Sequence, residues 1–367
     1  MKVVQLCTSE AIGGLEQVFE KYANWLHTSA HDMLGVVLEN SQLQKRLQAK
    51  GIPLVAFPSV SKLAVLPNAL RLARLMEEQE ADILHMHYKK DLTLAVLAKI
   101  LCRRSIKLIY TRHMHIANSK KDPWHRFFYQ KIDVFVTITE QMRQEAVRTI
   151  PLPEKAIKRL YTGVKAPQAF QEAACQGLLA EDQAPRPFSI AIFARIEKNK
   201  GQHLVLEAAK KLHSKYPALH YYFFGLAGDE AYNQSLLQTV QQENLHAFVH
   251  FKGFHKDPPA IMPCFEVVLL PSSNESFGLV LPEAMRAGVA VIGADAGGIK
   301  EIIDHEQTGL LFRVGDSGDL AEKIETIYLD PGLRQKLAQK GKEKADRLFN
   351  QETHYAELEE LYLNLLS

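Results

Sequence analysis

The chain has 367 residues, 47% of them hydrophobic, a length that suits two domains better than a single core. Its 44 Lys and Arg residues against 42 Asp and Glu leave a net charge of +2, which excludes the strongly basic surface typical of nucleic-acid-binding proteins. Four scattered cysteines without a CxxC pair argue against both a zinc site and a disulfide framework, as expected for a reduced cytosolic protein.

The ends and apolar runs of the chain bear on its location. The N-terminal run MKVVQLCTSE turns polar too early for a signal peptide, and nowhere are there roughly 20 apolar residues in succession. We therefore expect a cytoplasmic protein, either soluble or peripheral on the cytoplasmic face of the inner membrane.

The first half of the chain alternates strand-like and helix-like patterns. A short apolar run, Val3–Cys7, ends before Gly13 and Gly14, and apolar residues then recur at helical spacing as far as Leu26. The same patterns predict strands at Met33–Leu38, Ile83–Met86, Leu108–Thr111 and Val134–Ile138, with helices at Leu66–Glu78 and Leu92–Leu101. This alternation predicts a parallel sheet covered by helices.

A second series of the same kind follows a connection rich in proline and glycine, between Val164 and Pro187. Its predicted strands are Ser189–Ala194, Tyr221–Phe224, Val249–Lys252, Val267–Leu270 and Ala290–Gly293, and a last amphipathic helix covers Gln351–Leu366. The predicted fold class is α/β, with two doubly wound, Rossmann-like domains. The first comprises residues 1–165 and the second residues 166–349, followed by the last helix.

The loop after Val267–Leu270 is the strongest candidate for chemistry, because ligands of open α/β sheets bind beyond the carboxyl ends of the strands. Gly278 lets the backbone approach a ligand closely, and the amides at the start of the next helix suit a phosphate. Glu275 and Glu283 can accept hydrogen bonds from different hydroxyls of one extended ligand, such as a sugar and a ribose. On its own, the spacing of Glu275 and Glu283 more often marks two solvated carboxylates. The sequence block that surrounds them favours a ligand-binding site instead.

Several blocks of the second half carry a family resemblance. They are the Glu, seven residues, Glu spacing from Glu275 to Glu283 with SFG and PEAMRAG, the run FARIEKNKG with Ala194 where glycine is usual, and the runs GGIKEII, TGLLF, VHFKGF and YTGVKAP. Together these blocks resemble the retaining, EX7E-type glycosyltransferases (glycosyltransferase family 4-like, "glycosyl transferases group 1"). The resemblance implies the GT-B fold, in which an N-terminal acceptor-binding domain and a C-terminal donor-binding domain flank a cleft. It also implies that the last helix, residues 350–367, packs back on the first domain.

The resemblance also implies roles for individual residues. The donor-binding set is Gly13, Gly14, Arg195, Lys200, Glu275, Phe277, Gly278, Leu279 and Glu283. Arg195 and Lys200 would neutralise the diphosphate, which gains negative charge as the glycosidic bond breaks. Glu283 would hold the ribose and Glu275 the transferred sugar, while the backbone at Gly278 and Leu279 would hold the distal phosphate. Gly13 and Gly14 would offer main-chain amides from the first helix.

The catalytic set implied by the resemblance is His113, Arg195, Lys200 and Glu275. His113 follows the strand Leu108–Thr111 in the Thr-x-His context of the family's histidine near the reacting carbon, with His115, His85 and His87 as competitors. Family members retain anomeric configuration, commonly explained by front-face attack in which the leaving phosphate takes the acceptor's proton. No metal, cofactor or protein nucleophile is then implied.

The resemblance favours a UDP-sugar donor and a glycan or lipid-linked acceptor, as in lipopolysaccharide or cell-envelope polysaccharide synthesis. One alternative is a non-catalytic sugar-nucleotide-binding subunit of a glycan assembly complex, and another is phosphorolysis or epimerisation on the same fold. A nicotinamide-dependent dehydrogenase is poorly supported, because AIGGLE stands where such an enzyme has GxGxxG.

The segment Asn118–Lys131 mixes bases with aromatic residues. Lys120, Lys121 and Arg126 stand beside Trp124 and Phe127, a combination that suits anionic lipid head groups. A helix whose aromatic face belongs to the core is the alternative.

Overall fold

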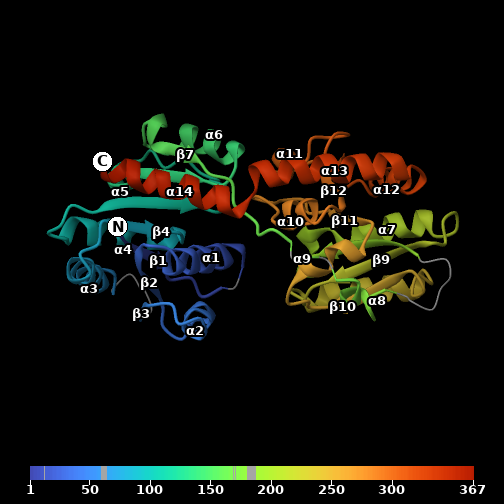
Figure 1. Ribbon diagram of the computed structural model, residues 1–367, viewed down its shortest axis with the longest axis horizontal. Coiled ribbons are helices and arrows are strands. Elements are labelled where there is room, and N and C mark those ends of the chain that lie inside the picture. Colours follow the sequence, from blue (N-terminus) through green and yellow to red (C-terminus); the bar gives the residue numbers. More distant parts are fainter. Residues whose placement is uncertain (12, 59–63, 168, 170, 180–186) are drawn as a thin grey trace. The chain divides into compact units, whose positions relative to one another are not determined.

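The computed structural model describes residues 1–11, 13–58, 64–167, 169, 171–179 and 187–367 (Figure 1). The chain forms two compact units, one of Met1–Thr162 with His354–Ser367 and one of Gly163–Thr353. The sequence placed the corresponding boundaries at residues 165 and 349. Acceptor binding and donor binding remain predictions for the two units.

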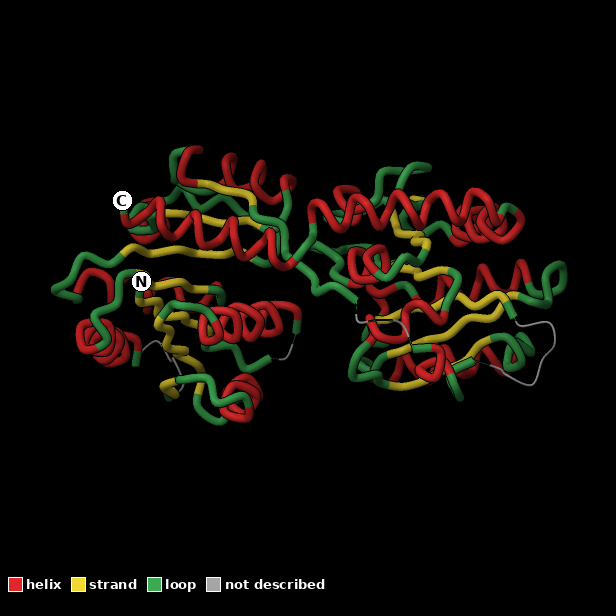
Figure 2. Tube along the Cα trace, viewed as in Figure 1, coloured by secondary structure: helices red, strands yellow, loops and turns green. Residues whose placement is uncertain are grey.

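The first unit is built on a seven-stranded sheet in the order β3-β2-β1-β4-β5-β6-β7, with every neighbouring pair parallel. Figure 2 distinguishes the strands from the helices and loops by colour. Its strands are β1 (Lys2–Cys7), β2 (Asp32–Leu38), β3 (Leu54–Phe57), β4 (Ile83–Met86), β5 (Lys107–Arg112), β6 (Val134–Thr137) and β7 (Ile157–Arg159). The strand order reverses between β1 and β4, the switch point at which open α/β sheets bind ligands.

Helices cover both faces of this sheet. They are α1 (Gly14–Thr28), α2 (Gln42–Ala49), α3 (Val65–Glu78), α4 (Leu92–Leu101), α5 (Pro123–Tyr129), α6 (Glu140–Thr149) and α14 (Gln351–Leu366), with short 3-10 turns η1 (Lys89–Asp91) and η2 (Glu154–Ala156). One apolar cluster joins α3, α4 and α5 to the sheet, and the other joins α1, α2 and α14. Leu358 and Tyr362 of α14 are fully buried in the second cluster, so the last helix completes the core of the first unit.

The second unit holds a six-stranded parallel sheet in the order β10-β9-β8-β11-β12-β13. Its strands are β8 (Phe188–Phe193), β9 (Leu219–Phe224), β10 (Val249–Gly253), β11 (Val267–Leu270), β12 (Ala290–Ala294) and β13 (Leu310–Phe312). Its helices are α7 (Gln202–Leu212), α8 (Glu230–Gln242), α9 (Pro258–Ile261), α10 (Val280–Arg286), α11 (Ile299–Ile302), α12 (Ser317–Leu329) and α13 (Pro331–Leu348), with 3-10 turns η3 (Glu172–Cys175), η4 (Lys198–Lys200) and η5 (Met262–Cys264). None of the helices within the described ranges of either unit is long and apolar enough to cross a membrane.

A buried arginine ties together the segments where the second unit begins and ends. Val164 donates its N–H to the Phe349 carbonyl at 2.8 Å, and Gln351 donates to the Val164 carbonyl at 3.1 Å. The guanidinium of Arg286, which is 5% exposed, also donates to the Val164 carbonyl and lies 2.8 Å from Asp346. Two chain segments far apart in sequence are thus fixed side by side.

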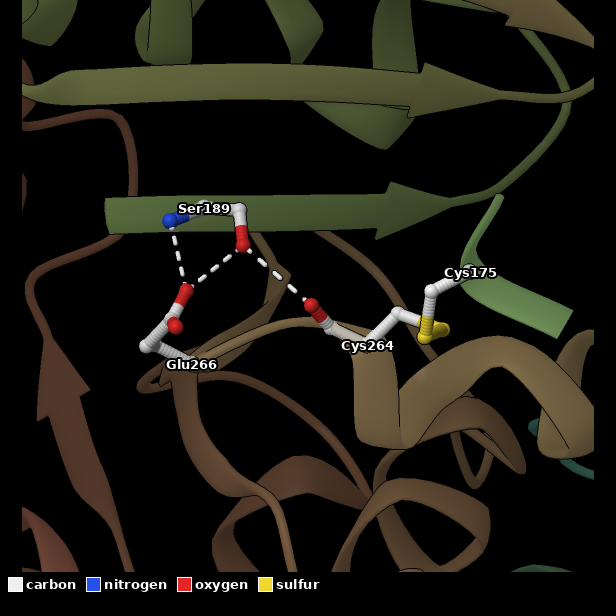
Figure 3. The surroundings of a disulfide bond; sticks show 4 residues. All are labelled: Cys175, Ser189, Cys264 and Glu266. Carbon is white, nitrogen blue, oxygen red and sulfur yellow. Dashed lines mark hydrogen bonds between the residues drawn. A yellow bond between two sulfur atoms is a disulfide. The ribbon is translucent and has the colours of Figure 1, made fainter. Parts of the chain in front are cut away.

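The expectation that the cysteines form no disulfide is wrong. Cys175 of η3 and Cys264 of η5 are bonded, with their Cα atoms 5.6 Å apart (Figure 3). Beside the bond, the Ser189 hydroxyl donates to Glu266 at 2.5 Å and to the Cys264 carbonyl at 3.4 Å. Sequence spacing concealed the pair, because 89 positions separate two segments that pack against each other. Cys7 and Cys102 are buried free thiols.

Candidate active site

The carboxyl edge of the second unit's sheet gathers most of the predicted donor-binding residues. Because β8 and β11 are parallel neighbours, the loops that follow them start at the same edge. Arg195 and Lys200 lie in the first loop and Glu275 in the second, and Ser273 donates its N–H to the Asn199 carbonyl at 3.1 Å to join the two loops.

Lys200 and Glu275 form an ion pair at this edge. Lys200 Nζ lies 2.6 Å from Glu275 Oε1, and the two side chains are only 19% and 16% exposed. Gly201, with φ of +76°, allows the loops to approach, since a Cβ there would lie 2.2 Å from the Pro271 carbonyl oxygen. The arrangement sets a cation and a carboxylate side by side in a half-buried site.

Arg195 is more open. Its side chain is 61% exposed and its NH1 lies 2.8 Å from Glu197 Oε1. The backbone beneath it is fixed, because Gln202, almost fully buried, donates Nε2–H to the Arg195 carbonyl at 2.8 Å. A fixed backbone with an exposed guanidinium leaves the side chain able to turn toward an anionic ligand.

The Ser276-Phe277-Gly278 loop has a more specific architecture than its sequence indicated. Gly278 has a φ of +94°, a conformation that favours glycine, and Gly298 donates its N–H to the Glu275 carbonyl at 2.9 Å. A Cβ on Gly297, which has a φ of +49°, would lie 2.2 Å from that same oxygen. The Gly297-Gly298 pair therefore supports the backbone of Glu275, a role that the sequence block GGIKEII did not reveal.

The remaining predicted donor residues differ in exposure. Phe277 is buried, with its ring edge-on to Phe349 at 5.6 Å between centroids, so its side chain is a packing element. Leu279 directly precedes α10, and Glu283 is a half-buried residue within that helix. The predicted roles of their backbone and carboxylate groups stay predictions.

The start of α1, in the first unit, already has an anionic partner. Gly13 donates its N–H to Glu16 Oε2 at 2.8 Å, which is one half of a capping box, since glycine has no side chain to form the other half. A Cβ on Gly14 would meet nothing within 4 Å. A phosphate that binds the Gly13 amide would therefore have to take the place of the Glu16 carboxylate.

A buried aspartate holds the segment that leads from β1 to α1. Asp91 accepts a hydrogen bond from the Thr8 N–H at 2.9 Å and another from the Thr8 hydroxyl. Burial raises the pKa of Asp91 to about 7, against the opposing effect of these two hydrogen bonds. The sequence offered no signal for this contact, which spans 83 positions.

His113 lies at the carboxyl end of β5 and is 8% exposed. Arg112 fixes its loop by donating to the carbonyls of Met114 and His115 at 2.7 and 3.0 Å. Burial, and secondly the charge of Arg112, lowers the pKa of His113 to about 3, so the imidazole is neutral at physiological pH. Its Nε2 lies 3.2 Å from Nδ1 of His87.

The competing histidines have structural partners. His115 Nδ1 contacts both carboxylate oxygens of Glu145 at 2.9 Å. His85 is fully buried between Tyr362 and Thr111, at 2.6 and 2.7 Å. Within the described ranges, no three His, Cys, Asp or Glu side chains are arranged to hold a metal ion.

Comparisons with known proteins agree with this architecture. The family described as "Glycosyl transferases group 1" matches residues 181–344, and the family described as "Glycosyltransferase Family 4" matches residues 12–166. The chain is 28% identical to an N-acetyl-alpha-D-glucosaminyl L-malate synthase of Bacillus anthracis, over 81% of this chain and 78% of that protein. It is 23% identical to the capsular polysaccharide biosynthesis glycosyltransferase CapM of Staphylococcus aureus, over 82% of this chain and 81% of that one.

Solved structures match along the whole chain. Anabaena Alr3699/HepE in complex with UDP superposes with a TM-score of 0.84 at 22% identity, covering 99% of this chain and 100% of that one. A glycosyltransferase from Rickettsia africae gives a TM-score of 0.90 at 19% identity, covering 100% and 98%. The two Rossmann-like units thus have the GT-B fold, as the sequence predicted. With both family matches in place, the chain belongs to the family 4-like, group 1 glycosyltransferases.

Proposed function

We propose that the chain is a retaining glycosyltransferase that takes its sugar from a nucleotide sugar, with a UDP-sugar as the favoured donor. The Lys200–Glu275 pair carries this proposal, because a cation and a carboxylate, groups that suit a phosphate and a sugar hydroxyl, lie 2.6 Å apart at the edge of the sheet where open α/β sheets bind ligands. Arg195, exposed in the same loop, supplies the second cation for the diphosphate.

The names of similar proteins support the choice of donor and acceptor. HepE has been solved with UDP and with UDP-glucose, and the relative from Bacillus anthracis is named for an N-acetylglucosaminyl product. CapM is named for capsular polysaccharide synthesis. For this chain we accordingly propose a UDP-sugar donor and a glycan or lipid-linked acceptor of the cell envelope, lipopolysaccharide among them.

In the proposed reaction the diphosphate leaves with its charge neutralised by Arg195 and Lys200. The acceptor hydroxyl attacks the anomeric carbon from the same face, and the departing phosphate oxygen takes its proton, so the configuration is retained without a metal ion. Glu275 holds the transferred sugar and Glu283 the ribose. His113 acts as a neutral hydrogen-bonding group on the sugar, since its low pKa excludes imidazolium at neutral pH.

Ligand binding is the first test. A thermal-shift screen compares UDP, GDP, ADP and NAD, since a ligand that binds only the folded state raises the melting temperature. We expect UDP to stabilise the protein, Glu283→Ala to weaken that effect, and Glu322→Ala, which removes an exposed carboxylate of α12, to leave it intact. Stabilisation by NAD alone, or by no nucleotide, would contradict the proposal.

Turnover is the second test. Incubation with UDP-sugars and candidate glycan acceptors, followed by NMR of the product, reports both transfer and anomeric configuration. We expect a retained configuration and unchanged rates in EDTA. UDP binding without transfer to any acceptor would favour the alternative of a sugar-nucleotide-binding subunit, while release of sugar phosphate or an epimer would indicate phosphorolysis or epimerisation.

We also propose that α5 contacts the inner-membrane surface. The aromatic side chains of α5 lie on two sides of the helix. Phe128 and Tyr129 are buried in the core, whereas Trp124 and Phe127 are 67% and 49% exposed. The bases Lys120, Lys121, Arg126 and Lys131 lie in and beside this helix. Exposed aromatic residues bordered by bases match a surface of anionic lipid head groups.

Liposome sedimentation tests this contact. Vesicles rich in phosphatidylglycerol should bind the protein and pure phosphatidylcholine vesicles should not. The charge reversals Lys120→Glu and Arg126→Glu together should abolish binding, whereas Lys336→Glu with Lys340→Glu, two exposed lysines of α13, should not. Undiminished binding of the first variant would contradict membrane contact through α5.

A further inference from the structure

Two histidines from neighbouring strands of the first unit share one hydrogen bond. His87 directly follows β4 and His113 directly follows β5, and these strands are parallel neighbours. The two imidazole rings are nearly parallel, at 20°, and His87 Nδ1 lies 3.2 Å from His113 Nε2. A contact of this length between two ring nitrogens requires a proton on one of them and a lone pair on the other.

Both rings are neutral. Burial is the main cause that lowers the pKa of His113 to about 3, and it places the pKa of His87 well below the ordinary range of histidine. The charges of His85 and of His113 would also oppose a charge on His87. Each ring therefore carries a single proton, and the direction of the shared hydrogen bond determines whether the other nitrogen of His113, Nδ1, carries a proton or a lone pair.

The surroundings of His87 decide the direction of the bond. Its other nitrogen, Nε2, is buried and makes no hydrogen bond with any residue that the structure describes. Phe19 and Tyr22 pack against the ring, each at 5.4 Å between centroids, and His85 stacks on it at 4.3 Å. A buried N–H without an acceptor is rarer in proteins than a buried lone pair without a donor. The proton of His87 therefore belongs on Nδ1, inside the shared contact.

We propose that His87 is a positioning residue that donates Nδ1–H to His113 Nε2 and so holds His113 in the tautomer with its proton on Nδ1. His113 then presents an N–H donor, rather than a lone pair, at the nitrogen remote from His87. That nitrogen makes no hydrogen bond within the described part of the chain. The catalytic consequence rests on the proposed function, because it assumes that His113 contacts the oxygen of a sugar hydroxyl.

Nitrogen-15 NMR of the protein labelled at its histidines tests the tautomer directly, because two-bond ¹H–¹⁵N correlations identify the protonated nitrogen of each ring. The His113 signal is assigned by its loss in His113→Gln. Two variants of His87 are compared. His87→Asn places an amide close to the former Nδ1 and can still donate, whereas His87→Leu fills the space without a donor.

We expect the Nδ1–H form of His113 in the natural protein and in His87→Asn, and a shift toward the Nε2–H form in His87→Leu. We expect kcat to fall about tenfold in His87→Leu, with the KM of the donor little changed, and to stay within about threefold in His87→Asn. An Nε2–H form in the natural protein, or an unchanged tautomer in folded His87→Leu, would overturn the proposal. Because the spectra need no substrate, the hydrogen bond is tested even if the protein transfers no sugar.

Discussion

Lys200 and Glu275 neutralise each other across two loops, with Lys200 Nζ 2.6 Å from Glu275 Oε1. In the proposed complex each side chain would bind a different part of the donor, the lysine a phosphate and the carboxylate a sugar hydroxyl. Exchanging one strong contact for another keeps both groups paired at every stage, which avoids leaving a half-buried charge unsatisfied.

The two side chains should therefore have separable effects. Lys200→Met is expected to weaken UDP binding about 10- to 100-fold, the loss that corresponds to one hydrogen bond to a charged group. Glu275→Gln is expected to lower kcat by a similar factor and to leave UDP binding nearly unchanged, since UDP lacks the transferred sugar. Calorimetric titration with UDP and steady-state kinetics measure the two quantities. Lys198→Met, an exposed lysine of the same turn, is the matched control and should behave like the natural protein.

Gly297 should tolerate no side chain. Its φ of +49° disfavours other residues, and a Cβ would lie 2.2 Å from the carbonyl oxygen of Glu275. Gly297→Ala is expected to lower the free energy of unfolding by about 3 kcal/mol and to weaken UDP binding, because the Glu275 loop must move. Gly288→Ala separates strain from contact, since that glycine also has a positive φ, +75°, but has nothing within 4 Å of its Cβ.

Urea unfolding of the two variants gives the comparison. Gly288→Ala should cost only about 1 kcal/mol and leave UDP binding unchanged. Equal losses of stability in the two variants, with UDP binding intact in both, would show that the contact beneath Glu275 is unimportant.

The sequence predicted those strands that are buried on both faces, because such strands are continuous apolar runs. Val267–Leu270 and Ile83–Met86 have the predicted bounds. Three strands were missed, namely Leu54–Phe57, Ile157–Arg159 and Leu310–Phe312. All three lie at the edges of their sheets, and none of them is fully buried, unlike the two strands that have the predicted bounds.

For the candidate site, sequence motifs predicted the ligand-binding residues but not the contacts that support them. Lys200 and Glu275 were predicted for one ligand, and the structure adds that they contact each other. The contacts of Asp91 with Thr8 and of Gly298 with Glu275 join positions far apart in the chain. No local pattern encodes such pairs, because each depends on which strands become neighbours in the sheet.

Asp91 should make stability depend on pH. Its pKa rises from 3.8 to about 7 on folding, so the folded state holds a proton that the unfolded state has lost between these values. The stabilisation that this proton gives the folded state is complete below about pH 4. It is lost as the pH rises through 7, and it is absent at higher pH. Its full size is about 4 kcal/mol. Asp91→Asn can accept from the Thr8 amide and donate to the Thr8 hydroxyl, so it retains both contacts without titrating.

Urea unfolding from pH 4.5 to 8.5 tests this dependence. The free energy of unfolding of Asp91→Asn relative to the natural protein should rise with pH and level off above about pH 8. Using the difference removes the contributions of other titrating groups common to both proteins. A difference that stays constant over the whole range would show that Asp91 does not titrate within it.

The Cys175–Cys264 bond should stabilise the second unit. It closes a loop across 89 positions, and a cross-link of this kind typically contributes about 2–4 kcal/mol by restricting the unfolded chain.

Mass spectrometry under non-reducing conditions first establishes the bond, and melting is then followed with and without a reductant. Reduction should lower the melting temperature of the natural protein and of Cys102→Ser, which alters only a buried free thiol. The double variant Cys175→Ser with Cys264→Ser should melt at the lower temperature in either condition. If reduction left the melting temperature of the bonded protein unchanged, the bond would add no stability, and packing between η3 and η5 would suffice to hold the two segments together.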